Sequence, residues 1–576
     1  MFKCKQLLRR ICVVSYVFLL CGGLVNASNL VSKTNTLIGT QGNGWASGYL
    51  YPGATYPFGM VQFTPTYFTK QLGFVINQLS GAGCDHMGNF PTLPIAGALR
   101  VSPDSILNMQ TPVGKEIGTA GYYAATVDHS IRAELTVTER TGMARYTFSS
   151  KEKQGTVIIG GGVAATSIQV AAIKITGPHS CEGYAEGGAF CGIPTPYKVY
   201  FVAEFDADAE SFGTWKEERL HANHTFAEGS HSGVYFTFPL KEGNQAVQYK
   251  IGVSYVSVEN ARENLRVENP AWDFSAVRQA TQDKWNEYLG KIEVEGDNED
   301  RQMQFYTHLY RSLIHPNVCS DVNGEYMGAD SQVHKIARKF YTSFSNWDTY
   351  RTQTALIAML APEETSDIVM SHYLFAEQSG GGFPRWVLAN IETGVMQGDP
   401  TPILVANAYA FGARNYDPRT LLRTMRYGAE VPGANSQGVL TRPGLEQYLE
   451  KGYYDASILL EYTSSDFAIG RFALQACNDE PVCNWYTQRA MNWKNLFNKE
   501  TGWLQSRNGD GSWKRYDADW RESTYKNYFW MVPYDLQGLI DSIGGKEAAE
   551  KRLDEMFRRL DASYGDEWFA SGNEPS

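Results

Sequence analysis

The order of hydrophobic and polar residues changes about midway along this chain. In the first half, short runs alternate apolar and polar residues, and Gly and Asn residues separate the runs. A period of two is typical of antiparallel strands that bury one face. The clearest runs are AELTVTE from Ala133, VIIG from Val157 and YKVYFVAEF from Tyr197. We therefore predict an antiparallel β-sandwich over residues 28–273.

A helical pattern begins after the sequence NPAWDF, which starts at Asn269. Residues 274–300 are predicted to form a helical linker that contains a helix from Ala276 to Gly290. In residues 301–576 long Gly-rich loops separate further helices, and loops of this kind commonly carry binding sites. We therefore expect an all-helical barrel of paired helices, with a site built from its loops. The predicted helices are Gln302–Ile314, Thr349–Leu360, Ser366–Ser379, Pro402–Gly412, Asp455–Ala476, Cys483–Phe497 and Tyr534–Ile543.

Residues 1–27 have the pattern of a signal peptide. A basic start precedes the apolar stretch Ile11–Val25, and small residues mark a cleavage site after Ala27. We expect export to the periplasm, the cell surface or the medium. The alternative is a lipoprotein signal at Cys21, although Leu20 stands where a small residue is preferred. No later stretch of the sequence is long and apolar enough to cross a bilayer.

The length, net charge and aromatic content of the chain limit the classes of molecule that it is expected to bind. A chain of 576 residues needs at least two hydrophobic cores, which argues against a small binding module. The net charge of −11 would repel phosphate backbones, so nucleic acid is not expected as a partner. Aromatic residues make up 13% of the chain, and their rings pack well on sugars, although core packing is the alternative for any single ring.

Six cysteines remain once the leader is removed. Two pairs lie close in the sequence and are expected to form disulfides in an oxidising compartment, Cys181 with Cys191 across a Gly-rich loop and Cys477 with Cys483 across a polar turn. The other two, Cys84 and Cys319, are expected to be free and buried. None of the spacings fits a zinc site.

Three carboxylates lie among aromatic and amide residues rather than on charged helix faces. They are Asp348 in SNWDTYR, Glu392 in ANIETG and Glu522 in DWREST. Such an acid could bond sugar hydroxyls or transfer a proton, and a helix cap or a structural ion pair is the alternative for each. In GNEPS, Asn573 and Glu574 could bind a hydroxyl or a hard cation, a polar terminal turn being the alternative.

Eight blocks follow one another along nearly the whole chain after the leader. They are GTQGNGWASGYLYPGATYPFGMVQFTP from Gly39, LSGAGCDHMGNFPTLP from Leu79, FYTHLYRSLIHPNV from Phe305, NWDTYRTQTALIAMLAPE from Asn346, WVLANIETGVMQGDPTPILVANAYAFG from Trp386, NWKNLFNKETGWLQ from Asn492, FWMVPYDLQGLI from Phe529 and ASGNEPS from Ala570. Together they resemble the signature blocks of glycoside hydrolase family 92. The resemblance implies an exo-acting, calcium-dependent α-mannosidase that inverts the anomeric centre, with an amino-terminal β-sandwich packed on an (α/α)6 barrel.

The resemblance also implies a mechanism with two carboxylates. An acid protonates the glycosidic oxygen while a base on the opposite face of the sugar activates water. Calcium (Ca2+) is expected to bind two adjacent mannose hydroxyls and to help distort the ring. The substrate is therefore expected to be an α-mannoside glycan.

Several residues of this chain match functional positions of the family. Glu522 matches the general acid, and Trp347 and Asp348 match the residues that grip the non-reducing mannose. The remaining matches are Gly42, Asn43 and Gly44, in the loop by which the sandwich reaches the site, and Asn573 and Glu574, which contact the leaving-group sugar or support the metal region.

The sequence departs from the family pattern in two places. Family members usually have Glu-Gly-Asn at the acid, whereas Ser523 and Thr524 follow Glu522 here. Typical α-1,2 enzymes have His-Glu where this chain has Asn573 and Glu574, so we do not expect α-1,2 specificity.

The family sequence continues past the Asn-Glu-Pro-Ser motif into a region that carries the catalytic base and the main calcium ligands. The barrel is therefore expected to be incomplete in this chain. We expect the fragment to be inactive, and to aggregate or express poorly because apolar helix faces would be exposed.

Two alternatives to the mannosidase remain. One is an α-glucosidase, trehalase or phosphorylase on the same scaffold, which would need no calcium. The other is a catalytically dead mannoside-binding protein of the cell surface. Sensitivity to a chelator would separate the first alternative from a mannosidase, and binding without turnover would indicate the second.

Overall fold

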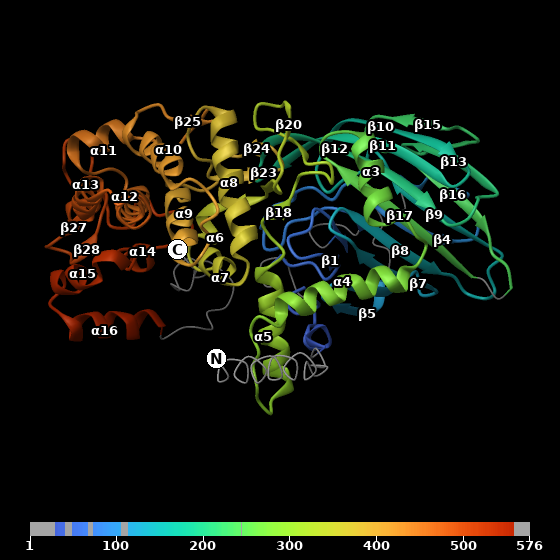
Figure 1. Cartoon of the computed structure of the whole chain (residues 1–576), viewed down its shortest axis with the longest axis horizontal. Helices are drawn as coiled ribbons and strands as arrows, with labels where there is room; N and C mark the ends of the chain where they lie inside the picture. The colour runs from blue at the N-terminus through green and yellow to red at the C-terminus, as the bar shows by residue number, and fades with distance from the viewer. Residues whose placement is uncertain (1–28, 41–48, 67–72, 105–112, 243–244, 558–576) are drawn as a thin grey trace, which may run out of the picture.

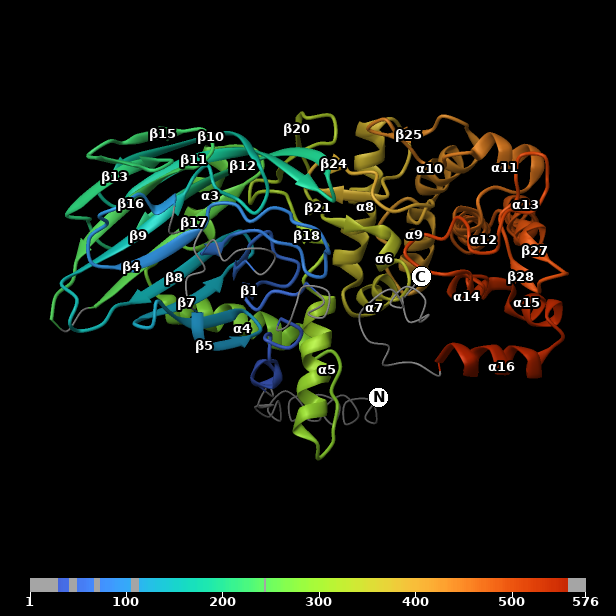
Figure 2. The same ribbon diagram turned by 180° about the vertical axis from the view of Figure 1, so that it is seen from behind.

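The computed structural model describes residues 29–40, 49–66, 73–104, 113–242 and 245–557. Figure 1 shows an antiparallel β-sandwich at one end of the long axis and helices at the other, and the reverse view in Figure 2 shows the same arrangement. The predicted fold class, a β-sandwich followed by a helical domain, is confirmed. The predicted signal peptide lies outside the described residues.

Two sheets form the sandwich. In spatial order, the described strands of the first sheet are β1 (Ala54–Thr55), β2 (Gln62–Pro65), β3 (Phe74–Val75), β4 (Thr92–Ala96), β9 (Gln154–Gly160), β16 (Ser232–Pro239), β13 (Ser211–Lys216) and β14 (Arg219–Ala222). Those of the second are β15 (Phe226–Glu228), β10 (Ile168–Gly177), β11 (Ser180–Phe190), β12 (Ile193–Phe205), β17 (Ala246–Ser254), β8 (Thr141–Thr147), β7 (Ile131–Val137), β6 (Tyr122–Val127) and β5 (Val113–Thr119). Inward side chains from both sheets, among them Phe63, Phe201 and Trp215, form one core.

Three helices connect the sandwich to the rest of the chain: α3 (Val258–Glu268), α4 (Phe274–Leu289) and α5 (Glu299–Ser312). The Asp273 side chain accepts a hydrogen bond from the backbone N–H of Ala276 at 3.0 Å, which caps α4 and explains why the helical pattern starts there. Trp285 on α4 is fully buried, and its indole N–H donates to the carbonyl of Thr55 at 2.7 Å. The predicted linker helix is therefore docked against the sandwich.

Long helices dominate the second half of the chain. They are α7 (Gln353–Leu360), α8 (Pro362–Ser379), α9 (Thr401–Ala410), α10 (Pro418–Glu430), α11 (Leu445–Lys451), α12 (Ala456–Cys477), α13 (Glu480–Ala490), α15 (Leu536–Ser542) and α16 (Lys546–Phe557). The longest, α12, is buried on most of its surface and packs against α9, α10 and α13. No helix within the described residues is long and apolar enough to cross a membrane.

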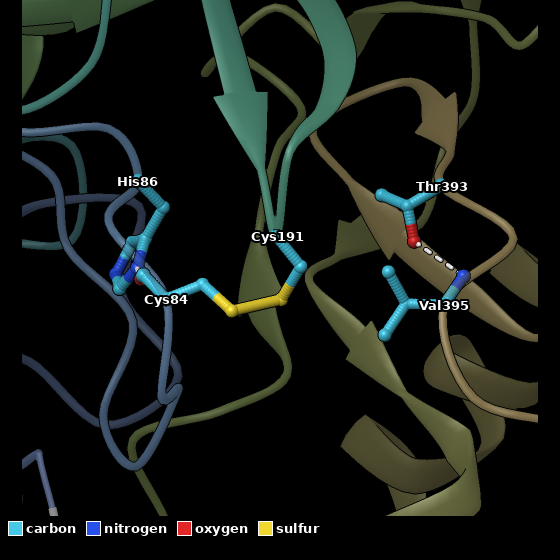
Figure 3. Close-up of a disulfide and its surroundings, with 5 residues drawn as sticks. All are labelled: Cys84, His86, Cys191, Thr393 and Val395. Carbon is cyan, nitrogen blue, oxygen red and sulfur yellow. Dashed lines mark hydrogen bonds between the residues drawn. A yellow bond between two sulfur atoms is a disulfide. The ribbon is translucent and has the colours of Figure 1, made fainter.

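The structure contains a disulfide between Cys84 and Cys191, so the predicted pairing of Cys191 with Cys181 is wrong. The Gly-rich stretch between Cys181 and Cys191 is the extended strand β11, and ten residues of strand separate its ends by about 33 Å. Cys181 is a free, buried cysteine. Figure 3 shows the disulfide joining the tip of the β11–β12 hairpin to the loop that carries His86, beside the segment with Thr393 and Val395.

The second predicted disulfide, between Cys477 and Cys483, is also wrong, because both cysteines are free. Their helices are already joined by a tight turn, in which Asp479 caps α13 by accepting from the Val482 N–H at 3.2 Å. The Cys483 sulfur contacts the hydroxyl of Thr487 at 3.9 Å along α13. Cys84, predicted to be free, is bonded, whereas Cys319 is free and buried as predicted.

Peptide mapping without reductant is expected to recover Cys84 linked to Cys191. The bond spans a sequence separation of 107 residues. Replacing both cysteines with Ser is expected to lower the free energy of unfolding by about 2–4 kcal/mol, because the unfolded chain gains conformational freedom without the link. Denaturant titration of the oxidised protein and the double variant measures this difference. A map that links Cys191 to Cys181 would contradict the structure.

Candidate active site

Asp348 lies on the short helix α6 (Asn346–Thr349), which a buried hydrogen-bond network holds in place. The Asn346 side-chain amide donates to the Thr401 hydroxyl at 2.9 Å, and its oxygen contacts His372 Nε2 at 2.9 Å. The ring of His372 stacks on Phe344, with 3.7 Å between the ring centroids. These contacts fix the backbone that presents Asp348.

The Asp348 carboxyl reaches solvent but is crowded by the surrounding chain. Loss of water around it raises its pKa, while the hydroxyl of Ser345, which donates to it, and the positive charge of Arg351 act in the opposite direction. The neighbouring Trp347 is only 5% exposed, and the guanidinium of Arg351 covers its ring at 4.6 Å from the centroid. The Trp347 ring is therefore buried, with the Arg351 guanidinium over it.

Hydrogen bonds to helices α12 and α14 (Tyr525–Tyr528) fix the loop that carries Glu522. The Ser457 hydroxyl at the start of α12 donates to the carbonyl of Asp519 at 2.7 Å. The Tyr528 hydroxyl donates to the carbonyl of Arg521 at 3.2 Å. The backbone on both sides of Trp520 is thus tied to the helical core.

Glu522 combines an unusual backbone with a perturbed carboxyl. Its φ of 48° lies in the left-handed region, which non-glycine residues adopt rarely and often at functional sites. Loss of water raises the pKa of its carboxyl, the negative charge of Asp348 raises it further, and Arg521 lowers it. The structure therefore brings Asp348 and Glu522 into electrostatic contact, and a carboxyl of this kind keeps its proton to a higher pH than usual.

A polar cavity of about 540 Å³ lies beside Glu522. This volume is typical of small-molecule sites and can accept a sugar. Trp520 forms part of the wall of the cavity, and the centroid of its ring lies 5.3 Å from the ring centroid of Tyr528. The lining residues are Gln397, Asp455, Ser457, Ile458, Asp517, Asp519, Trp520, Arg521, Glu522 and Ser523.

The third candidate carboxylate, Glu392, has a structural environment. It is buried, and its two oxygens accept hydrogen bonds from the backbone N–H groups of Arg385 at 2.6 Å, Trp386 at 3.2 Å and Gly394 at 2.8 Å. These three bonds join the start of β23 (Trp386–Leu388) to the chain at the end of β24 (Ile391–Glu392). Glu392 therefore shapes a loop and is not free to bind a substrate.

The other candidate residues lie outside the described residues: Gly42, Asn43 and Gly44, and Asn573 and Glu574. Within the described part of the chain, no group of three or more His, Cys, Asp or Glu side chains is placed to hold a metal ion. The described residues thus supply a carboxyl with a raised pKa and a cavity, and no cluster of three or more carboxylates among them marks a place for calcium.

Two family models together match most of the chain. The glycosyl hydrolase family 92 N-terminal domain matches residues 34–254, and the family 92 catalytic domain matches residues 260–576. This chain belongs to glycosyl hydrolase family 92. The boundary between the two matches falls between β17 and the body of α3, where the sandwich ends.

Solved family 92 structures share this fold. A family 92 α-mannosidase from Bacteroides thetaiotaomicron has a TM-score of 0.84 at 25% identity, with 92% of this chain and 75% of that chain covered. A family 92 inverting mannosidase from the same organism has a TM-score of 0.82 at 26% identity, covering 93% of this chain and 75% of that chain. A curated relative from Arthroderma benhamiae, named an uncharacterized secreted glycosidase, is 25% identical over 95% of this chain and 76% of its own length.

Gln397, Ser457 and Trp520 are among the residues of the cavity lining that were not singled out from the sequence. Trp520 could have been predicted, because it stands two residues before Glu522 in DWREST. Gln397 lies within one of the eight family blocks but carries no charge. Ser457 lies at the start of a mainly apolar helix, where nothing in the sequence marks it.

Proposed function

We propose that this family 92 protein is an exo-acting hydrolase that releases mannose from α-mannosides with inversion. The observation that carries the proposal is Glu522, a carboxyl with a raised pKa beside a sugar-sized cavity, at the position that matches the family acid. The names of the two Bacteroides structures, an α-mannosidase and an inverting mannosidase, support the choice of substrate and stereochemistry.

In this proposal Glu522 donates its proton to the glycosidic oxygen as the bond to the leaving group breaks. Burial and the negative charge of Asp348 both raise the pKa of Glu522, which favours the protonated form that the step requires. The Asp348 carboxylate also accepts hydrogen bonds from sugar hydroxyls. The leaving group lies in the cavity, where Trp520 supplies an aromatic wall.

Calcium is part of the proposal on the strength of the family resemblance. It would bind mannose hydroxyls and favour a distorted ring. Because the described residues do not form a calcium site, we derive no step through the metal.

We also propose that the protein is exported. The leader pattern of residues 1–27 supports this, as does the description of the Arthroderma relative as secreted.

The proposed function is tested by assaying release of mannose from α-mannobiose isomers, with and without a calcium chelator. The assay uses the chain Met1–Ser576 and, beside it, any longer product of the same gene. Turnover by the longer product, which the chelator abolishes and added calcium restores, is the expected result, and the assay of Met1–Ser576 alone tests the expectation that this fragment is inactive. Hydrolysis of α-glucobioses that resists the chelator would favour the glucosidase alternative. Binding of mannosides by a folded protein without turnover would favour the binding protein.

A further inference from the structure

A fully buried carboxyl, that of Glu461 on α12, lies behind the candidate active site. The Tyr350 hydroxyl donates to its Oε2 at 3.2 Å. On its other side is Gly398, where an added Cβ would lie 2.5 Å from the Cβ of Glu461. Gly398 has a φ of 77°, so both its backbone and its lack of a side chain suit this close approach. Glu461 is therefore held firmly against the loop that carries Gln397 into the cavity.

Arg351 lies between Glu461 and the site. Its Nη2 is 3.6 Å from Oε1 of Glu461, and its guanidinium is 4.9 Å from the ring centroid of Tyr350. The same positive charge lowers the pKa of Asp348, and Asp348 in turn raises the pKa of Glu522. One guanidinium thus interacts with a carboxyl inside the core and with a carboxyl at the site.

We propose that Glu461 is a positioning residue of the active site, which acts through Arg351 on the carboxyls of Asp348 and Glu522. The inference rests on the proposed function, in which Glu522 is the proton donor. Glu461 itself touches no substrate. Its effect is to hold the guanidinium and to take up part of its charge, so that less positive charge acts on Asp348.

The charged and titratable groups around Glu461 come from several elements. They are Arg351 and Tyr350 after α6, Arg385 before β23 and Tyr528 on α14. Burial raises the pKa of Glu461 to about 7, and the positive charge of Arg351 opposes this rise. Glu461 therefore gains its negative charge near neutral pH. Once ionised, it offsets part of the positive charge of Arg351 and so favours the protonated form of Glu522.

The test replaces Glu461 with Gln, which keeps the shape and can still accept from Tyr350. The general acid must be protonated, so its ionisation sets the alkaline limb of the pH profile of kcat/KM. Removing the buried negative charge is expected to move this limb to lower pH by about half a unit or more, with little change in KM. Tyr350→Phe, which removes a donor to the Glu461 carboxylate, is expected to move the limb the same way by less. The matched control is Glu450→Gln on the exposed face of α11.

A second readout needs no turnover. The folded-state pKa of Glu461, about 7, is higher than the ordinary value of 4.5, so its stabilising contribution is complete below pH 4.5 and is lost as the pH rises through 7. The Tm of the wild type is therefore expected to fall relative to that of Glu461→Gln between pH 5 and pH 8.

The outcomes separate the inference from the proposed function. An unshifted alkaline limb in a folded, active Glu461→Gln protein overturns the positioning role and leaves the mannosidase in place. A Tm difference that does not change with pH, together with an unshifted alkaline limb, also overturns the inference, because Glu461 would then carry no negative charge at any pH tested. The absence of turnover on any mannoside, by the longer product as well as by Met1–Ser576, overturns the proposed function, and this inference with it.

Discussion

Replacing Glu522 with Gln is expected to lower kcat on α-mannobiose by about 10²–10⁴-fold, with a small change in KM. The amide keeps the size of the side chain and its place beside the cavity but has no proton to give to the leaving oxygen. The loss should therefore appear in the chemical step rather than in binding. Steady-state kinetics at the pH optimum measures both constants.

The leaving group provides a sharper test of the Glu522 role. From a dinitrophenyl α-mannoside the leaving group departs as the stable dinitrophenolate anion and needs no proton, so the Gln variant should retain far more of its activity on this substrate than on α-mannobiose. The matched control is Glu500→Gln, which removes one exposed carboxylate outside the cavity lining. An equal loss on both substrates would show that Glu522 supports the structure of the site and is not its acid.

Replacing Asp466 with Asn is expected to lower the free energy of unfolding by about 3–5 kcal/mol. Asp466 lies on α12 with no exposed surface, and its carboxylate accepts from Arg442 at 2.7 Å, from Arg489 at 2.7 Å and from the Tyr448 hydroxyl at 2.7 Å. These two arginines hold the pKa of Asp466 below its usual range. A neutral amide would leave two buried guanidinium groups with only Asp399, which pairs with Arg442, to balance them.

Denaturant titration with fluorescence detection measures the Asp466 effect. The control is Asp517→Asn, which breaks the exposed pair of Asp517 with Arg515 and should leave the free energy of unfolding nearly unchanged. Equal, small losses in both variants would mean that the buried network contributes little to stability.

The alternation of apolar and polar residues predicted the sandwich, because one face of each strand is buried. The close packing of neighbouring strands explains why the disulfide between Cys181 and Cys191 was predicted wrongly. Glycines between Cys181 and Cys191 suggested a loop, but at Gly183 an added Cβ would lie 2.3 Å from the carbonyl oxygen of Ala172 on the neighbouring strand. Glycine is present there because two strands approach closely, which the sequence does not distinguish from a turn.

The helices were predicted where apolar periodicity is strong, but α3, α10, α11 and α16 were missed, α10 despite a clear start signal. No prediction covered α10, although Asp417 accepts from the Thr420 N–H at 3.2 Å and Pro418 begins the helix.

The residues of the candidate site could be predicted from the sequence only in part. Local composition marked Asp348 and Glu522 as candidates, but their approach depends on tertiary packing across 174 positions of sequence. Glu461 was missed because it lies in a mainly apolar helix, where no sequence motif marks a single carboxylate as functional.

The tip of the β11–β12 hairpin contacts both domains, so the length of the hairpin must match the distance between these contacts. Its tip is bonded to the Cys84 loop, and the ring of Phe190 stacks on Trp386 with 4.2 Å between the centroids. Surface hairpins usually tolerate insertions and deletions, but here each added residue would lengthen a strand by about 3.3 Å and carry Phe190 away from its partner. Chimeras that exchange the sandwich between family 92 proteins therefore need to exchange the hairpin, the Cys84 loop and the Trp386 segment as one unit.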